Sequence, residues 1–426
     1  MKVKRLDWSG TNPRALAADL RGLGPEESIT GGVREILERV RGGGDAAVRE
    51  QAERFGEVAP ESLRVDPEAV AAAPGMLDPD VREALRLAAV NIQAVARAEL
   101  EALNNPALAE LPQGQRIEVR NEPVAAAGVY VPGGKAPYPS SVLMCCLPAK
   151  VTGVSRVAVA SPPGPSGRPD PLVLAAAALC GVEEVYAIGG AQAIAALTFG
   201  TESVERVDVI VGPGNRYVTE AKRLVFGHVG IDGLAGPSEL FVVADSMADP
   251  ATIALDVLAQ AEHGADAPLV VVSPDSELLD GIAEAVEELA PERTSVEDAP
   301  LALVSAPGIE VALDLADAFA PEHLELVFTG ADANAARSRV AGCVFVGPSG
   351  ATAFGDYVAG SNHVLPTGGA ARFGGPLGPR AFMRRTSVVT IGPDAANDLA
   401  PLVETIAGAE GFPVHGESAR ARGGDA

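Results

Sequence analysis

Short apolar runs alternate with helix-like runs from about residue 115 onward, and this alternation limits the fold more than any other feature of the chain. In the first series, three runs typical of strands alternate with two runs typical of helices: 156–162, 171–181, 184–190, 191–200 and 207–213. Strands that alternate with helices form parallel sheets whose crossover connections are right-handed. The sequence therefore predicts an α/β fold built on a parallel sheet.

A second series of the same kind follows residue 236. Its strand-like and helix-like runs occupy 240–245, 249–264, 268–274, 275–290, 301–307, 324–330 and 342–348. We therefore predict two α/β units in tandem, the first over 115–235 and the second over 236–381. Residues 347–381 are rich in glycine and proline, and loops of that length in compact proteins are usually functional.

The N-terminal part of the chain has a different pattern. Apolar residues recur at helical spacing over 32–56 and 78–103, and Asp78 is the expected N-cap of the second helix. Residues 1–114 are therefore predicted as a helical segment, which forms a unit of its own or packs on the second α/β unit.

The C-terminal part of the chain predicts one strand and one long helix. A β-rich run at 386–392 precedes a helical run at 394–411, and polar residues follow it to the end of the chain. We predict a small C-terminal helical arm over 382–426. Within that arm, His415 lies five residues after Glu410, although the chain has only 5 histidines in 426 residues.

The charge of the chain excludes several kinds of partner. Lys and Arg total 33 against 57 Asp and Glu, a formal net charge of −24 that repels nucleic acid and anionic lipid surfaces. No apolar run approaches the 18 or so residues of a membrane span, and the N-terminus lacks the apolar stretch of a secretion signal. We expect a cytoplasmic protein without nucleic-acid or membrane partners. Its four cysteines, Cys145, Cys146, Cys180 and Cys343, are expected to be reduced and buried.

Two histidines lie beside residues that suit acid–base or metal chemistry. His263 ends a helical run one turn after Gln260, so the two side chains share a face, although a histidine before glycine can also be a C-cap partner. His323 directly follows Glu322. We expect this pair at the carboxyl edge of the parallel sheet, where α/β proteins bind ligands, and a solvated turn is the alternative.

Other histidines extend this set. His363 lies in the glycine-rich segment, seven residues after Asp356, whereas His228 has no acidic or amide neighbour and is interpreted as structural. Together with His415 and Glu410, these side chains supply nitrogen and oxygen ligands but no thiolate, which suits a divalent ion such as Zn²⁺. No local metal-binding motif is present, so such a site would be assembled from distant segments.

Two glycine turns between a strand and a helix are candidates for phosphate binding. "YAIGGAQAIAAL" and "VIVGPGNRYVTEAKRLV" both place glycines where helix N–H groups could meet a phosphate. The second contains Gly212 and Gly214, but Tyr217 stands where the dinucleotide fingerprint has its third glycine. A plain tight turn is therefore as good an interpretation as a nucleotide site.

Long motifs in one order resemble the histidinol dehydrogenase family over residues 20–416. The motifs are "VYVPGGKAPYPSSVLM", "GGAQAIAAL", "VGPGNRYVTEAKR", "GIDGLAGPSE", "AQAEHG", "APEHLEL" and "GDYVAGSNHVLPTGGAARF". The resemblance implies a cytoplasmic, zinc-dependent homodimer that oxidises L-histidinol to L-histidine through the aldehyde and reduces one NAD⁺ in each step. It also implies two incomplete Rossmann-like units without the usual glycine fingerprint.

The resemblance also implies roles for individual residues. The bases correspond to Glu322 and His323. The zinc ligands correspond to Gln260, His263, Asp356 and His415, the last from the other subunit. The local sequence alone favours Glu262, so the choice of Gln260 comes from the resemblance. Substrate contacts correspond to Ser238, His363 and Glu410 as well as to these residues, and NAD contacts to Tyr130, Gln192 and Asn215.

Three alternative functions remain open. One is an NAD-dependent dehydrogenase of another amino or sulfonated alcohol, against which the matching Glu410 and His363 argue. Another is a zinc-dependent hydrolase on the same fold, in which the metal activates water and no NAD is needed. A third is a catalytically silent metal-binding oligomer, against which the intact Glu322–His323 pair argues.

Overall fold

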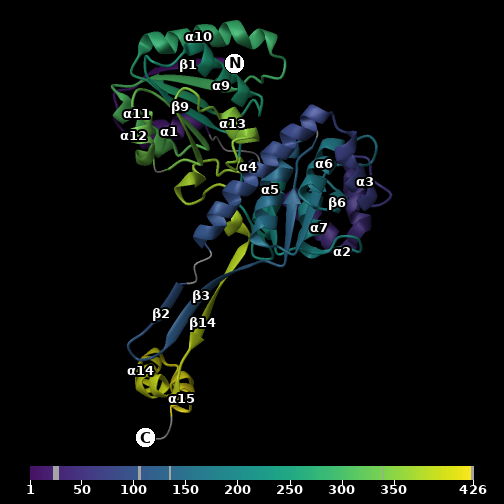
Figure 1. Cartoon of the computed structure of the whole chain (residues 1–426), viewed down its shortest axis with the longest axis vertical. Coiled ribbons are helices and arrows are strands. Elements are labelled where there is room, and N and C mark those ends of the chain that lie inside the picture. The colour runs from purple at the N-terminus through teal and green to yellow at the C-terminus, as the bar shows by residue number, and fades with distance from the viewer. Residues whose placement is uncertain (23–27, 104–106, 134–135, 339, 424–426) are drawn as a thin grey trace. The chain divides into compact units, whose positions relative to one another are not determined.

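The computed structural model describes residues 1–22, 28–103, 107–133, 136–338 and 340–423. The described chain divides into two compact units (Figure 1). Unit 1 comprises Met1–Arg97 and Ala125–Phe382, and unit 2 comprises Ala98–Val124 and Met383–Ala426. The division into four segments that the sequence suggests stays a prediction.

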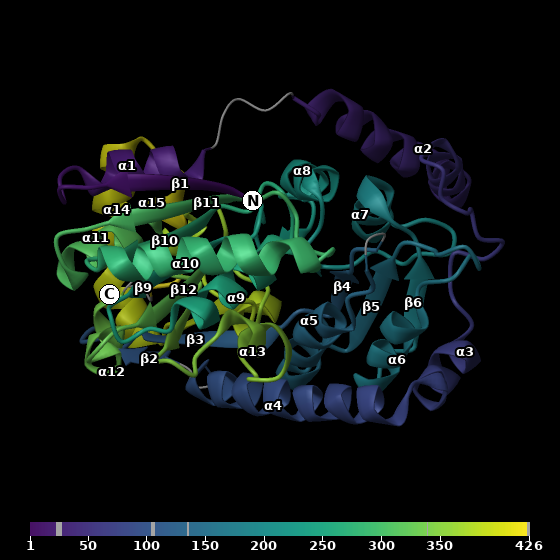
Figure 2. The ribbon, with the colours of Figure 1, turned by 90° about the horizontal axis from the view of Figure 1, so that it is seen from above.

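The first strand–helix series of unit 1 forms a five-stranded parallel sheet. Its elements are β4 Ala126–Tyr130, α5 Pro139–Thr152, β5 Arg156–Ser161, α6 Pro171–Leu179, β6 Glu184–Ala187, α7 Gly190–Phe199, β7 Val209–Val211, α8 Arg216–Val225 and β8 Gly230–Ile231. The strands lie in the order β6-β5-β4-β7-β8, and all pairs are parallel. Every residue of β4 is buried, as expected of a strand covered on both faces, and α6 and α7 lie on opposite sides of the sheet (Figure 2).

The second series of unit 1 forms a six-stranded parallel sheet. Its elements are β9 Leu240–Ala244, α9 Pro250–Ala261, β10 Leu269–Ser273, α10 Ser276–Leu289, β11 Pro300–Ser305, α11 Ile309–Phe319, β12 His323–Val327 and β13 Cys343–Val346. The strand order is β1-β11-β10-β9-β12-β13, where β1 is Lys2–Asp7. Alternate residues of β9 face opposite sides: Leu240 and Val242 pack with α9 and α10, whereas Phe241 and Val243 pack with α11. The predicted α/β fold with parallel sheets is confirmed.

The N-terminal residues are not helical throughout, as the sequence had suggested. The strand β1 pairs in parallel with β11, placing Lys2 opposite Pro300, and α1 Pro13–Arg21 packs on the second sheet. The predicted helices do form, as α2 Thr30–Arg54 and α4 Pro79–Leu103, with α3 Pro67–Ala72 between them. Asp78 accepts a hydrogen bond from the N–H of Asp80, which confirms its role as N-cap.

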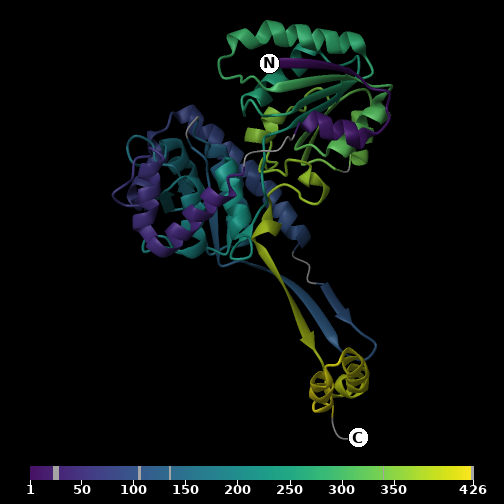
Figure 3. The same ribbon diagram turned by 180° about the vertical axis from the view of Figure 1, so that it is seen from behind.

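Unit 2 joins two segments that are distant in the sequence. Its antiparallel sheet has the order β14-β3-β2, formed by β2 Ala107–Glu110, β3 Arg116–Pro123 and β14 Met383–Thr390. The run at 116–120 therefore pairs with β14 and not with the first α/β sheet, where the sequence had suggested it. The helices α14 Pro393–Glu410 and α15 Pro413–Arg420 follow β14 (Figures 1 and 3). The predicted final helix is confirmed, and His415 lies in α15.

Short elements complete the fold. They are η1 Ala73–Met76, η2 Ala290–Glu292, α12 Ala331–Asn334, η3 Ala335–Arg337, α13 Thr352–Tyr357, η4 Ala370–Arg372 and η5 Pro379–Phe382. The last three, with their connections, form the glycine-rich segment after β13. Within the described residues, no helix combines the length and the hydropathy that crossing a membrane requires.

Candidate active site

The Glu322–His323 pair lies where the chain enters β12, and Ser238 and Glu239 lie where it enters the parallel neighbour β9. These residues therefore gather at the amino edge of the second sheet. The prediction of the carboxyl edge is wrong for this pair, because α11 ends at Phe319 and the turn after it leads directly into β12. The pair is buried, so the alternative of a solvated turn is also excluded.

The Glu322 carboxylate is held by a chain of hydrogen bonds. Gln260 donates its Nε2–H to Ser238 Oγ at 2.6 Å, and Ser238 Oγ–H donates to Glu322 Oε2 at 2.5 Å. The Glu239 N–H also donates to Glu322 Oε2, at 2.8 Å. Burial raises the pKa of Glu322 to about 8, although the hydrogen bonds from Ser238 and from the Glu239 N–H oppose the shift. A carboxyl group with such a pKa can take up and release a proton near neutral pH.

His323 is oriented by the backbone of Glu239. Its Nδ1 lies 3.0 Å from the Glu239 carbonyl oxygen, and because a carbonyl only accepts, Nδ1 carries the hydrogen of a neutral ring. The other nitrogen, Nε2, then keeps its lone pair and lies 3.7 Å from Asp356 Oδ1. Burial lowers the pKa of His323, which keeps the ring neutral and able to accept a proton at Nε2.

Asp356, in α13, lies between imidazoles. Its Oδ2 is 3.8 Å from His263 Nε2, and this interaction raises the pKa of His263. Burial alone would raise the pKa of Asp356, but the neighbouring histidines outweigh it and lower that pKa. The backbone carbonyl of Asp356 accepts from His363 Nδ1 at 2.9 Å, and His363 Nε2 accepts from Ser141 Oγ at 3.1 Å. Burial lowers the pKa of His363.

The predicted metal ligands that lie in unit 1 are Gln260, His263 and Asp356, and the structure brings His263 and Asp356 side by side. Because the Gln260 amide nitrogen is bound to Ser238, its carbonyl oxygen is the atom left for a cation. The three supply two oxygens and one imidazole nitrogen, donors that suit Zn²⁺. Glu262, which the local sequence also allowed, is exposed and accepts from Ser295. Within the described residues, no three His, Cys, Asp or Glu side chains form a metal cluster by themselves.

Two of the predicted site residues lie in unit 2. Glu410 is the last residue of α14, and His415 lies in the first turn of α15. Both are exposed, and the His415 ring contacts the Phe412 ring edge-on with centroids 5.7 Å apart. Their contribution to the site stays a prediction.

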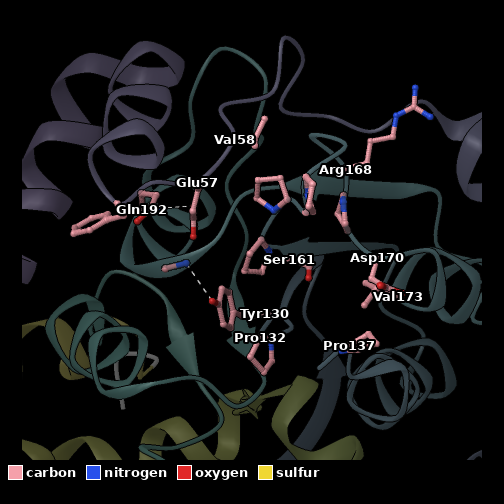
Figure 4. Close-up of a pocket in the computed structure, with 18 of the residues that line it drawn as sticks. Glu57, Val58, Tyr130, Pro132, Pro137, Ser161, Arg168, Asp170, Val173 and Gln192 are labelled. Carbon is pink, nitrogen blue, oxygen red and sulfur yellow. Dashed lines mark hydrogen bonds between the residues drawn. The ribbon is translucent and has the colours of Figure 1, made fainter. Parts of the chain in front are cut away.

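A cavity of about 950 Å³ opens at the carboxyl edge of the first sheet, and the three predicted NAD residues line it (Figure 4). Tyr130 ends β4, and its Oη accepts from the Gly190 N–H at 3.1 Å. Gln192 donates its Nε2–H to Glu57 Oε2 at 3.4 Å. Its Oε1 is buried without a hydrogen-bond partner in the described chain, so an acceptor remains for a ligand donor. Asn215 lines the cavity from the N-cap of α8.

The glycine turn that precedes α8 brings two backbone segments close together. A Cβ on Gly212 would lie 2.1 Å from the Tyr130 carbonyl oxygen, so the close backbone approach requires glycine there. Asn215 Oδ1 already accepts from the first N–H groups of α8, at Tyr217 and Val218.

The sequence analysis did not identify several residues that the structure places around these sites. Glu57, which follows α2, lines the cavity, and burial raises its pKa. Arg21 and Glu239 form a buried ion pair that joins α1 to the entrance of β9. Of these residues, Glu239 had a signal, because it is the last residue of the family motif "GIDGLAGPSE". His228 packs its ring against Phe199, in keeping with a structural role.

Comparison with known proteins gives one consistent result. A sequence model of the histidinol dehydrogenase family matches residues 21–423. The chain is 45% identical over 405 residues to the histidinol dehydrogenase of Parasynechococcus marenigrum (strain WH8102), covering 93% of this chain and 92% of that protein. It is 44% identical over 404 residues to that of Rhizobium meliloti (strain 1021), with coverage of 93% and 92%. The crystal structure of histidinol dehydrogenase from Elizabethkingia anophelis superposes with a TM-score of 0.90 at 30% identity, covering 99% of this chain and 98% of that chain.

Proposed function

The chain belongs to the histidinol dehydrogenase family, and from this premise we propose that it oxidises L-histidinol to L-histidine through L-histidinaldehyde, in a cytoplasmic homodimer. Family membership makes it a dehydrogenase that acts on an alcohol, in histidine biosynthesis. The overall change is one alcohol, one water and two NAD⁺ to one carboxylate, two NADH and three protons. NAD⁺ supplies the hydride acceptor in each step. The buried Glu322–His323 pair beside Asp356 is the observation that carries the proposal.

His323 is the base of the first oxidation. Removing a hydride from the carbinol carbon requires that the hydroxyl proton be taken away, and a neutral imidazole suits that task. The hydrogen bond from Nδ1 to the Glu239 carbonyl fixes the tautomer, so Nε2 is the accepting atom. The low pKa of His323 favours release of the proton after it is taken up.

Glu322 is the base of the second oxidation. Water adds to the aldehyde to form the hydrate, and a carboxylate that takes a proton from the water promotes this addition. With a pKa near 8, Glu322, once it has lost its own proton, is a stronger base than an ordinary carboxylate. The hydrogen bonds from Ser238 and from the Glu239 N–H hold Oε2, which leaves Oε1 to accept the proton.

Gln260, His263 and Asp356, with His415 of a second subunit, would hold zinc. When bound, zinc supplies a fixed point for the imidazole and amino nitrogens of the substrate. Ser238, His363 and Glu410 would contact the same substrate. Placing the carbinol carbon against the nicotinamide in this way removes much of the entropic barrier to hydride transfer.

Tyr130, Gln192 and Asn215 would bind NAD⁺ in the cavity of the first sheet. Its position agrees with the general rule that open α/β sheets bind ligands at the carboxyl ends of their strands. The unpartnered Gln192 Oε1 supports this assignment, because an adenosine, ribose or nicotinamide donor could satisfy it.

The proposal predicts a fixed stoichiometry. Purified protein supplied with zinc, NAD⁺ and L-histidinol should form two NADH for each histidine, measured by absorbance at about 340 nm and by chromatography of the product. Absence of NADH with histidinol would refute the proposal in favour of another alcohol or of a hydrolase.

Glu322→Gln tests the assignment of the two bases within this reaction. Glutamine keeps the acceptor oxygen for Ser238 but cannot take a proton, so oxidation of the aldehyde should fall by about 100-fold or more. Oxidation of the alcohol should fall much less, and NADH per histidinol should approach one. Equal losses in both steps would contradict the role of Glu322 as water activator.

A further inference from the structure

A buried ion pair joins the N-terminal helix α1 to the strand entrances that carry Glu322 and His323. Arg21, the last residue of α1, donates its Nε–H to Glu239 Oε1 at 2.9 Å and an Nη2–H to Oε2 at 3.5 Å. The side chains are 9% and 2% exposed, respectively. A carboxylate this deeply buried requires a partner of opposite charge, and among the described cations Arg21 is the one that contacts it.

The Glu239 carboxylate also binds the backbone on both sides of the site. Its Oε2 accepts from the Glu322 N–H at 3.2 Å, and its Oε1 accepts from the Gly368 N–H at 3.1 Å. In return, the Glu239 N–H donates to Glu322 Oε2, and the Glu239 carbonyl accepts from His323 Nδ1. One residue therefore orients both bases and ties them to the glycine-rich segment.

Arg21 makes a second contact on the turn that leads to the bases. Its Nη2 donates to the Phe319 carbonyl at 2.5 Å, and its guanidinium lies over the Phe319 ring, 4.1 Å from the ring centroid. The next residue, Ala320, has a φ of 55°, a left-handed conformation that non-glycine residues seldom adopt. Arg21 thus braces this turn from one side and Glu239 from the other.

We propose that Arg21 is a positioning residue for the reaction: through Glu239 and Phe319 it fixes the backbone that aims Glu322 and His323 at the substrate. The inference rests on the proposed function for the identity of the two bases. Without the guanidinium, the Glu239 carboxylate would be a buried charge without a partner, and it would turn toward water. Its hydrogen bond to the Glu322 N–H would then weaken, and the turn at Ala320 would lose its support.

Arg372 offers a matched control for the loss of an arginine at this turn. It donates to the Ala318 carbonyl and to the Gly369 carbonyl, so it also binds the end of α11 and the glycine-rich segment. It makes no contact with Glu239. Arg372→Met therefore removes a similar number of hydrogen bonds from the same turn without leaving a buried carboxylate unpaired.

The test compares these variants in the full-length, zinc-loaded protein. Arg21→Met should lower kcat for histidinol oxidation by about 10-fold to 100-fold, because displacement of a reacting group by about 1 Å has effects of that size. The KM for NAD⁺ should change by less than about twofold, since the cavity of the first sheet does not involve Arg21. Arg21→Lys, which keeps the charge but not the forked geometry, should be intermediate. Arg372→Met should keep kcat within about twofold of wild type.

A charge-neutral double variant separates positioning from general loss of stability. In Arg21→Met/Glu239→Gln no buried charge is left unpaired, so its loss of kcat should be smaller than the product of the two single losses. A normal kcat in a folded Arg21→Met protein would overturn the positioning role, as would equal losses of kcat in the Arg21 and Arg372 variants. A fully active Glu322→Gln protein would refute the role of Glu322 as a base, whereas absence of NADH from wild type with histidinol would refute the proposed function itself.

Discussion

Gln260 and Glu262 are two candidate metal ligands that lie two positions apart in the sequence, and their surroundings in the structure differ. Gln260 is 1% exposed and bonded to Ser238 inside the site, whereas Glu262 is exposed at the end of α9 and binds Ser295. A carboxylate is the commoner zinc ligand of the two, so residue type alone favours Glu262. The direction of each side chain favours Gln260.

This contrast predicts which variant loses its metal. Gln260→Ala should lower bound zinc by at least about tenfold, because it removes one ligand and also the donor that holds Ser238. Glu262→Ala should keep zinc and activity close to those of wild type. Zinc content would be measured by inductively coupled plasma mass spectrometry after dialysis against a weak chelator. Loss of zinc from Glu262→Ala but not from Gln260→Ala would reverse the assignment.

At the scale of elements, β12 and α13 are joined by a second buried carboxyl group. Glu325, two residues after His323, accepts at Oε1 from the N–H and Oγ–H of Thr352, the first residue of α13. Its Oε2 is buried without a partner in the described chain. Burial raises the pKa of Glu325 to about 8 and that of nearby Asp256 to about 6, both well above ordinary carboxyl values. Glu325 therefore holds a proton at neutral pH and anchors the helix that carries Asp356.

The sign of the resulting pH dependence follows from these shifts. Between about pH 4.5 and 8 the unfolded chain has lost the proton that folded Glu325 keeps, so raising the pH favours unfolding. We expect the urea midpoint of wild type to fall from pH 6 to pH 9. In Glu325→Gln, which has no proton to lose, the accompanying fall in the free energy of unfolding should be smaller by on the order of 2 kcal/mol. Glu277→Gln, an exposed change on α10, should follow wild type. Parallel curves for all three proteins would contradict a protonated Glu325.

The same scale shows what the sequence could and could not predict. Strands such as Leu240–Ala244 and Leu269–Ser273 lie inside predicted runs, because strands buried on both faces are continuously apolar. Lys2–Asp7 was missed because it is an edge strand with mostly exposed, charged side chains, and its partner β11 lies almost 300 residues later. The pairing of β3 with β14 is non-local in the same way.

Some features of the candidate site could also be predicted from the sequence, and others could not. Glu322, His323 and their neighbours were predicted as residues, since their types and the family motifs mark them. Their position at the amino edge was predicted wrongly, although a segment that follows a helix and precedes a strand of a parallel sheet lies at the amino end of that strand. Arg21 could not be predicted at all, since it reaches Glu239 from 218 positions away and has no motif of its own.

At the scale of the whole molecule, unit 2 carries two predicted site residues and an apolar surface. Leu402, Ile406 and Val414, on α14 and α15, are 57%, 61% and 68% exposed. Large apolar side chains gathered on one pair of helices are typical of a surface that another protein covers. This supports the proposed homodimer, in which His415 and Glu410 of one subunit reach the site of the other.

A mixture of two inactive proteins tests this sharing of sites. His323→Ala removes the base from unit 1, and His415→Ala removes a metal ligand from unit 2. If sites are shared, one of the two sites in a mixed dimer has both its base and its His415, whereas each homodimer lacks one of them at both sites. Mixed dimers, purified with two different affinity tags after unfolding and refolding together, should therefore recover close to half of the wild-type kcat.

Two controls show whether the recovered kcat comes from sites shared between subunits. Glu417→Ala changes an exposed residue two positions after His415, in the same helix, and should keep full activity without mixing. A mixture of His323→Ala with Glu322→Gln should gain nothing, because both changes lie in unit 1 and every site then lacks a base. Recovery of activity in that control would mean that the preparation contains contaminating wild-type subunits. If the first mixture stays inactive in proven heterodimers, each site is built within one chain.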